Sequence, residues 1–206
     1  MSIIHYFSKD ANKRAKFIFN LIAPVYGWID RHQAEKYAHT IDMLHQEISI
    51  KGKRVLDVGT GTGAWADMFV GKQAEEVYAV DLSQKMLDEG QKKHPEITFL
   101  LGDAENLAGL ADNSFDIVTA SFVLHGVKED RRRKILSEMR RVSRKHVVIN
   151  DFSGRTDKGA LVLEFLERSD FRNFKANFCN ELKNMFPIAR KLETDNGNGL
   201  YIALKE

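Results

Sequence analysis

The residues best suited to bind a ligand stand in one short stretch of the chain. An apolar run, Val55–Val58, carries a carboxylate and leads into three alternating glycines. Glycines let the main chain pass close to a ligand at points where any Cβ would collide with it. The pattern predicts a buried strand that breaks into a nucleotide-binding turn, formed by Asp57, Gly59, Thr60, Gly61 and Gly63.

A second carboxylate stands where the next strand is expected to end. Asp81 follows the apolar run Glu76–Val80, at the spacing of an acid that binds ribose hydroxyls. The two signals together predict a βαβ unit that binds an adenosyl ligand. Gly59, Gly61 and Ala64 also satisfy the dinucleotide pattern G-x-G-x-x-G/A, so NAD stays open at this point.

At these residues the chain resembles the class I S-adenosylmethionine (SAM) methyltransferases, whose first motif is an acid followed by G-x-G-x-G. Four further stretches extend the resemblance over about residues 52 to 152. They are VYAVDLSQKML, FLLGDAENL, FDIVTASFVLHGV and EMRRVSRKHVVINDF. The resemblance implies a Rossmann-like α/β fold, SAM as cofactor and S-adenosylhomocysteine (SAH) as product.

The resemblance also implies which residues meet the cofactor. Asp57 is expected near the positive methionine end, Asp81 at the ribose and Leu82 against the base. Asp57 has an alternative role, in which it braces the glycine turn by accepting its N–H groups. Ser121 and Asp151 follow later strands, whose carboxyl ends share one crevice in such sheets. The predicted cofactor-binding set is Asp57, Gly59, Thr60, Gly61, Gly63, Asp81, Leu82, Asp103, Ala104 and Ser121.

More narrowly, the chain looks like the type 11 methyltransferases and the ubiquinone/menaquinone-biosynthesis group. That group carries an N-terminal A-x-x-Y-D signature, which this chain keeps through Tyr26 before Gly27 replaces the aspartate. Its fourth-strand loop often reads L-H-H, where this chain has Leu124-His125-Gly126. The resemblance implies a small, apolar or aromatic methyl acceptor that is quinone-, phenol- or lipid-like. Tyr26 is expected to cover the methionine end or the acceptor, or else to be an ordinary packing aromatic.

Methyl transfer from SAM needs an aligned nucleophile more than a powerful catalytic group, because the sulfonium is an excellent leaving group. An acceptor that must lose a proton also needs a base. His125 is the predicted general base, since imidazole titrates near neutral pH and its loop leaves the fourth strand. The alternative is an oriented surface histidine without a catalytic role.

Composition indicates a single folded domain. The chain has 206 residues, 43% of them hydrophobic, and a formal net charge of +2. This is enough for one α/β core with a modest cap, and it is not typical of a disordered or nucleic-acid-coating protein. Cys179 is the single cysteine, which excludes an intrachain disulfide and a cysteine-based zinc site and favours a cytoplasmic location.

Apolar runs alternate with helical periodicity, a pattern typical of a parallel sheet with right-handed crossovers. The predicted strands are Arg54–Val58, Glu76–Val80, Thr98–Leu101, Phe115–Ala120, His146–Asn150, Ala189–Thr194 and Leu200–Lys205. The turn Asp195–Gly199 predicts that the last two form an antiparallel hairpin, which favours a methyltransferase sheet over a dinucleotide fold. We therefore predict one domain, 1–206, with a mostly parallel seven-stranded sheet and helices on both faces.

Two helical segments are expected to cap the acceptor site. Residues 1–50 form the predicted N-terminal cap, with an amphipathic helix over Ile29–Ile48, and residues 153–186 form a helical insertion. Within the insertion one helical face predicts a core-facing stripe, with the lining of an apolar pocket as the alternative. The stripe consists of Phe171, Phe174, Phe178 and Leu182.

The remaining signals are weaker. The basic run Arg131–Lys134 lies in a predicted helix with an apolar face, so we expect most of its charges to be solvated and no nucleic-acid partner. Basic and phenylalanine residues between Phe7 and Phe19 favour transient contact with a membrane surface. His32, His39 and His45 lack accompanying ligands, and no metal is predicted. An NAD(P)-dependent reductase and a SAM-binding RNA-interacting or regulatory module stay open as alternatives.

Overall fold

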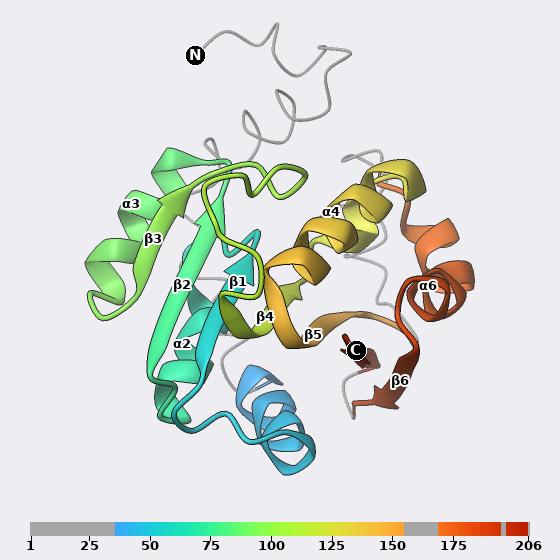
Figure 1. Cartoon of the computed structure of the whole chain (residues 1–206), viewed down its shortest axis with the longest axis horizontal. Coiled ribbons are helices and arrows are strands. Elements are labelled where there is room, and N and C mark those ends of the chain that lie inside the picture. The colour runs from blue at the N-terminus through green and yellow to red at the C-terminus, as the bar shows by residue number, and fades with distance from the viewer. Residues whose placement is uncertain (1–35, 155–168, 195–196, 206) are drawn as a thin grey trace, which may run out of the picture.

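A seven-stranded sheet runs through the middle of the protein in the order β3-β2-β1-β4-β5-β7-β6 (Figure 1). The computed structural model describes residues 36–154, 169–194 and 197–205. The strands are β1 (Arg54–Val58), β2 (Glu76–Asp81), β3 (Thr98–Leu101), β4 (Phe115–Ser121), β5 (Ser143–Phe152), β6 (Ile188–Glu193) and β7 (Asn198–Leu204).

The first five strands are parallel to one another, and β7 is antiparallel to both β5 and β6. The predicted fold is therefore confirmed, including the C-terminal hairpin. The main difference in bounds is β5, which is longer at both ends than the predicted His146–Asn150. Its pairing with β7 accounts for part of this, since the register runs from His146↔Leu204 to Phe152↔Asn198.

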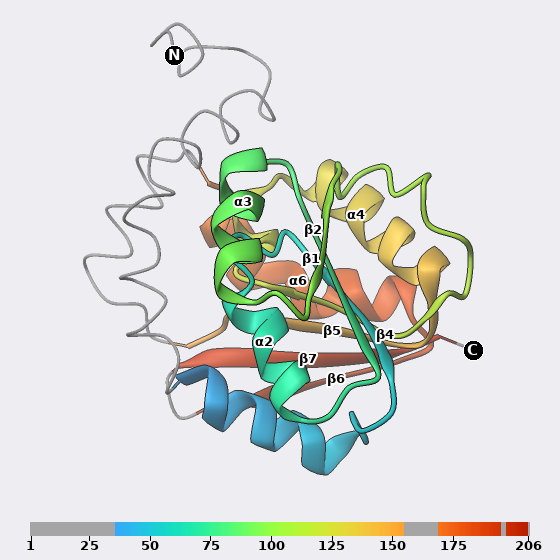
Figure 2. The same cartoon turned by 90° about the vertical axis from the view of Figure 1, so that its left-hand side faces the viewer.

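Helices cover both faces of the sheet, as Figures 1 and 2 show. They are α2 (Ala64–Gly71), α3 (Gln84–Lys93), the short 3-10 helix η2 (Leu124–Gly126), α4 (Glu129–Val142) and α6 (Phe171–Met185), with a further helix over residues 36–47. One core joins α4 and α6 to the sheet, and the other joins α2 and the 36–47 helix. In β1, Val55 belongs to the second core and Leu56 to the first, as expected for a strand buried on both faces.

The phenylalanine-rich face of α6 packs into the first of these cores. Phe174, Phe178 and Leu182 are at most 1% exposed, and Phe171 is 6% exposed. The predicted core-facing stripe is confirmed. Apolar residues at helical spacing are buried here because α6 lies against the sheet beside α4.

Several predictions concern residues outside the described part of the chain. They are Tyr26, His32, the residues from Phe7 to Phe19, and most of the N-terminal cap. Residues 155–168 of the insertion also lie outside it. Within the described ranges, no helix combines the length and the apolar character needed to cross a membrane.

Candidate functional site

The glycine turn after β1 has a conformation and a closeness of packing that only glycine allows. Gly59 has φ +72° and Gly63 has φ +88°, in the left-handed region. A Cβ on Gly59 would lie 2.6 Å from Val123 Cγ2, and one on Gly63 would lie 2.8 Å from Phe99 Cζ. The N–H groups of Gly59 and Thr60 both donate to the carbonyl of Val80, at 2.8 and 3.1 Å. The turn is therefore tied to the end of β2.

Asp81 fastens the same turn from the side of β2. Its Oδ2 accepts the N–H of Gly61 at 2.9 Å, and its Oδ1 accepts the N–H of Ser83 at 2.8 Å. Burial raises the pKa of Asp81, while these N–H donors act to lower it. Each oxygen of a carboxylate can accept a second hydrogen bond, so the group can also bind a pair of hydroxyls.

Asp57 is a buried carboxylate with no donor to satisfy it. It is 1% exposed, and neither of its side-chain oxygens has a hydrogen-bond partner in the described ranges. Burial raises its pKa to about 7, the nearby side chain of Thr60 acts to lower it, and the charge of Asp81 adds to the rise. The alternative that Asp57 braces the turn through N–H groups is wrong for the described residues. A carboxylate held this way favours a cation beside it.

The other predicted cofactor residues lie at the same edge of the sheet. Leu82 follows β2, and Asp103 and Ala104 follow β3, all partly buried. Asp103 Oδ1 accepts the N–H of Glu105 at 2.9 Å. Since the carboxyl ends of adjacent parallel strands meet at one edge, the structure brings these residues and the glycine turn together.

Ser121 ends β4 and belongs to a polar chain that runs towards the 36–47 helix. Asn150 Nδ2 donates to Ser121 Oγ at 3.0 Å, and Ser121 Oγ donates to the hydroxyl of Tyr37 at 3.4 Å. Asn150 Oδ1 is buried without a partner in the described ranges. Ser121 thus lies at the end of β4, between the glycine turn that follows β1 and the neighbouring strand β5.

His125 is held by a carboxylate that comes from β5. Its Nδ1 lies 2.7 Å from Oδ1 of Asp151, which is fully buried. Asp151 Oδ2 also accepts the N–H groups of Leu124 and His125, at 3.1 and 3.2 Å. A carboxylate can only accept, so Nδ1 of the neutral imidazole carries the proton and Nε2 is the basic nitrogen. His125 itself is 6% exposed, so the alternative of a surface histidine is wrong.

Four phenylalanine rings surround this imidazole. Their ring centroids lie 4.8 to 6.5 Å from that of His125, and all four meet it nearly at right angles; they belong to Phe122, Phe152, Phe171 and Phe174. Phe122 has φ +53°, a strained conformation for a residue with a Cβ. The basic nitrogen therefore lies among flat apolar surfaces.

Most charges of the basic helix α4 lie on a solvated face, as predicted. Arg133, Lys134 and Arg140 are exposed. Arg132 is the exception to this pattern among these residues, because it is fully buried. Sequence periodicity gave no sign of its carboxylate partner, Glu181, which lies 49 residues further along the chain.

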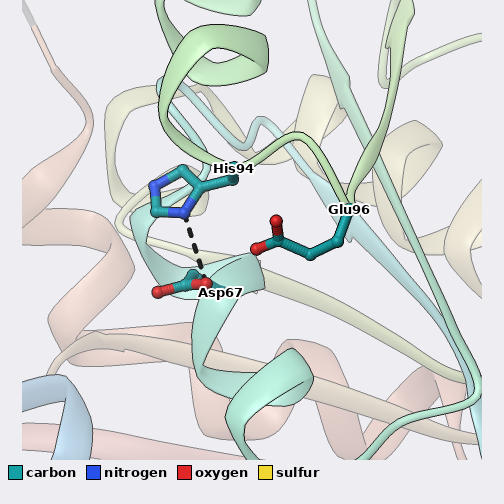
Figure 3. A group of neighbouring side chains, drawn as sticks. All are labelled: Asp67, His94 and Glu96. Carbon is teal, nitrogen blue, oxygen red and sulfur yellow. Dashed lines mark ion pairs between the residues drawn. The ribbon is translucent and has the colours of Figure 1, made fainter.

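A further polar group supports the glycine turn from the outside. His94 ends α3, and its Nδ1 lies 3.2 Å from Oδ1 of Asp67 in the first turn of α2 (Figure 3). Glu96 points towards the pair, and one ligand atom from each of the three lies within 4.8 Å of the others. A Cβ on Gly63 would lie 3.4 Å from His94. The contact between His94 and Asp67 joins the start of α2 to the end of α3.

Comparison with known proteins agrees with this architecture. Residues 55–146 match the family described as a methyltransferase domain. A demethylmenaquinone methyltransferase of Renibacterium salmoninarum is 42% identical over 156 residues, which cover 75% of this chain and 59% of the relative. One of Paenarthrobacter aurescens is 43% identical over 104 residues, or 50% of this chain and 40% of the relative. The chain thus matches less than two thirds of either relative.

The fold also matches solved structures. The magnesium protoporphyrin IX methyltransferase of Synechocystis, with bound SAM, superposes with a TM-score of 0.68 at 16% identity, over 97% of this chain and 99% of that one. At this low sequence identity, the comparison supports a shared fold and nothing about function. The resemblance to class I methyltransferases is confirmed by the matched domain together with the fold.

Proposed function

We propose that this chain, which carries a class I methyltransferase domain, is a SAM-dependent methyltransferase acting on a small acceptor. The observation that carries the proposal is the pair of carboxylates around the glycine turn. Asp57 has no partner for its charge in the described ranges, and Asp81 is held by two N–H groups. Asp57 is suited to bind a cation and Asp81 to bind a pair of hydroxyls. SAM has a positively charged sulfonium and ammonium, and its ribose has two neighbouring hydroxyls.

The residues of the cradle fit that cofactor. Asp57 accepts the positive methionine end, and Asp81 accepts the ribose hydroxyls. The bare backbone at Gly59, Gly61 and Gly63 lets the main chain approach the ligand closely. Leu82, Asp103 and Ala104 lie beside the adenine, and Thr60 and Ser121 complete the proposed set. When bound, SAM supplies a methyl group on a sulfonium leaving group.

The surroundings of His125 support an acceptor with an apolar ring and an acidic proton. His125 Nε2 takes this proton, and the imidazolium so formed is stabilised by Asp151 at 2.7 Å. Phe122 and Phe152 are only partly buried and flank the imidazole, where they favour a flat apolar partner. A quinol or phenol has both properties, and the names of the relatives from Renibacterium and Paenarthrobacter point the same way.

The wider setting is part of the same proposal. The N-terminal cap, residues 1–50 with Tyr26, and the insertion, residues 153–186, cover the acceptor. The chain works in the cytoplasm with residues 1–206 as one methyltransferase domain, and an apolar acceptor suits transient contact with a membrane surface.

An NAD(P)-dependent reductase is the weaker candidate. The doubly wound dinucleotide fold has the strand order 3-2-1-4-5-6. Here β7 is antiparallel and lies between β5 and β6. A regulatory SAM-binding or RNA-interacting module would have no need for the dyad of His125 and Asp151.

Thermal unfolding with SAM, SAH, NADH or NADPH tests the cofactor, because a ligand that binds the native state raises its stability. We expect a shift with SAM and SAH alone. A shift with NADH or NADPH alone would overturn the proposal. Methyl-labelled SAM incubated with quinol, phenol and lipid acceptors then tests the reaction. Binding of SAM without transfer to any acceptor, in the presence of membrane vesicles as well, would favour the regulatory module.

A further inference from the structure

Arg132 is a charged side chain buried where the function described so far does not require a charge. It lies in the first turn of α4, and its guanidinium is fully shielded from solvent. Burying a charge costs several kcal/mol unless partners compensate for it. The partners of Arg132 therefore indicate what the residue is for.

The first partners lie on α6 and at its start. Arg132 Nε and Nη2 donate to the two oxygens of Glu181 at 2.9 and 2.8 Å, as a parallel pair of bonds. Nη1 donates to Asp170 Oδ2 at 3.1 Å. Burial alone would lower the pKa of Arg132, but its bonds to Glu181 and Asp170 outweigh this and raise it. The guanidinium therefore stays charged and joins α4 to α6.

The second partners lie on the turn that carries His125. Arg132 Nη1 also donates to the carbonyl of Val127 and lies 3.5 Å from that of Leu124. Asp151 binds the N–H groups of Leu124 and His125 in the same turn. The short helix η2 is thus held by its N–H groups from β5 and by its carbonyls from α4.

The aromatic surroundings belong to the same arrangement. The guanidinium of Arg132 lies 5.5 Å from the ring centroid of Phe174, and this ring lies 6.4 Å from His125. Phe174 and Glu181 are both on α6. A displacement of α6 would therefore move the η2 turn together with Phe171 and Phe174, the two rings around His125 that lie on α6.

Buried ion pairs are a poor source of stability, because well-packed apolar side chains often replace them at no cost. A fork of two parallel bonds does fix geometry, and lysine cannot reproduce it. The buried pair of Arg132 and Glu181 thus contributes more to the placement of the segments it joins than to the free energy of unfolding.

We propose that Arg132 and Glu181 are positioning residues for His125. They fix the positions of the η2 turn and of the two α6 rings, Phe171 and Phe174, relative to the acceptor. This rests on the proposed function for its catalytic consequence. The structural consequence, a fixed orientation of the imidazole, does not depend on it.

Arg141 offers a matched control on the same helix. It also forms a fork with a glutamate, at 2.8 and 2.9 Å to Glu138, and also donates to two carbonyls, those of Leu107 and Leu110. These carbonyls lie in the segment between β3 and β4, away from η2. Arg141 is more exposed than Arg132, at 28% against 0% for the side chain, and also binds Asp112. Arg141→Lys therefore removes a fork of the same geometry without touching the His125 turn.

The experiment compares Arg132→Lys, Glu181→Gln and Arg141→Lys by methyl transfer and by ¹⁵N spectra of histidine-labelled protein. The imidazole signals of His125 are assigned by their loss in His125→Gln, and His146 at the far end of β5 is the internal reference. We expect Arg132→Lys and Glu181→Gln to lower kcat at least about tenfold, with KM for SAM within about twofold. We expect the signals of His125 to leave the single Nδ1–H tautomer while those of His146 stay unchanged. Arg141→Lys should leave both readouts within about twofold of the wild type.

Two results would overturn the proposal. One is wild-type kcat and wild-type His125 signals in both Arg132→Lys and Glu181→Gln. The other is an equal loss of activity in Arg141→Lys and Arg132→Lys in proportion to the fall in Tm, since a merely structural role predicts this. If the wild type transfers no methyl group to any acceptor, the proposed function fails by itself, and the imidazole spectra alone decide whether Arg132 and Glu181 position His125.

Discussion

The proposed cofactor side of the site, around the glycine turn, and the proposed acceptor side, around His125, are built in different ways. On the cofactor side the contacts are mostly made by the main chain, as between Gly61 and Asp81, or between the glycine turn and Val80. On the acceptor side they are made by buried side chains, as between His125 and Asp151, or Arg132 and Glu181. The cofactor side is thus specified by a local pattern, and the acceptor side by tertiary contacts. We expect substitutions on the two sides to separate binding of SAM from catalysis.

The largest expected effect is on the acceptor side. His125→Gln should lower kcat by about 10²- to 10⁴-fold, the usual contribution of a general base, and leave the Kd for SAH within about twofold. Single-turnover transfer to the best acceptor measures the rate of the chemical step, and calorimetry measures the Kd for SAH. His146→Gln, at the start of β5, is the control and should change neither. An equal loss of SAH binding in His125→Gln would break the distinction between the two sides.

On the cofactor side, Asp81→Asn should weaken SAH binding by about 100-fold, because each hydrogen bond to a carboxylate contributes about 1.5–3 kcal/mol. The asparagine keeps the shape of the side chain but can no longer accept at both positions. Calorimetry measures the Kd. The control is Asp88→Asn on α3, where the carboxylate contacts only Gln84 among its described partners. A Kd within twofold of the wild type would remove the ribose role of Asp81.

The free energy of unfolding of the wild type and that of Asp57→Asn should depend differently on pH. The pKa of Asp57 is raised to about 7, so between about pH 4 and pH 7 the native protein keeps a proton that the unfolded chain has lost. The free energy of unfolding of the wild type should therefore fall with rising pH relative to that of Asp57→Asn. At about 1.4 kcal/mol per pKa unit, the difference between the two proteins should change by up to about 4 kcal/mol over this window.

Urea unfolding of both proteins between pH 4.5 and 8 measures this difference, and parallel curves would contradict it. The same substitution should weaken SAM more than SAH, because only SAM carries the sulfonium charge. Equal losses for SAM and SAH would place the carboxylate away from the sulfonium.

The smallest effect on SAH binding should come from the pair of His94 and Asp67, which lies outside the proposed cofactor and acceptor sides. His94→Gln removes the contact with Asp67 that supports the glycine turn. We expect it to lower the free energy of unfolding by less than about 1 kcal/mol, as for other partly exposed pairs, and SAH binding by less than about threefold. The exposed pair of Lys92 and Glu89 supplies the control, Lys92→Gln. A tenfold loss of SAH binding would mean that the cofactor side depends on this tertiary contact.

The sheet could be predicted almost to the residue because its strands are apolar runs with clear ends. Arg54–Val58 and Thr98–Leu101 were predicted with the observed bounds. β5 was predicted too short at its C-terminal end, because its pairing there depends on a strand 46 to 48 residues away along the chain, through Asp151↔Gly199 and Phe152↔Asn198. The positions of Asp57 and Asp81 at the edge of the sheet follow from the same logic of strand ends.

The acceptor side could be predicted only in part. A loop after the fourth strand suggested His125, but nothing local indicates that Asp151 binds it or that four rings enclose it. The burial of Arg132 could not be predicted within a run whose charges were mostly expected to be solvated, since a helical pattern of charges does not reveal a carboxylate on another helix. Buried polar pairs between distant segments leave no periodic signal, and a structure is needed to find them.

The placement of β7 between β5 and β6 has a consequence for synthesis of the protein. In chain order it is the last of the seven strands, yet it supplies the partner for the whole inner edge of β6 and for the edge of β5 opposite β4. Until β7 leaves the ribosome, β5 presents an open row of N–H and C=O groups to any other strand nearby. Since β5 also carries Asp151, the strand that holds His125 is the one whose edge stays open until β7 pairs with it.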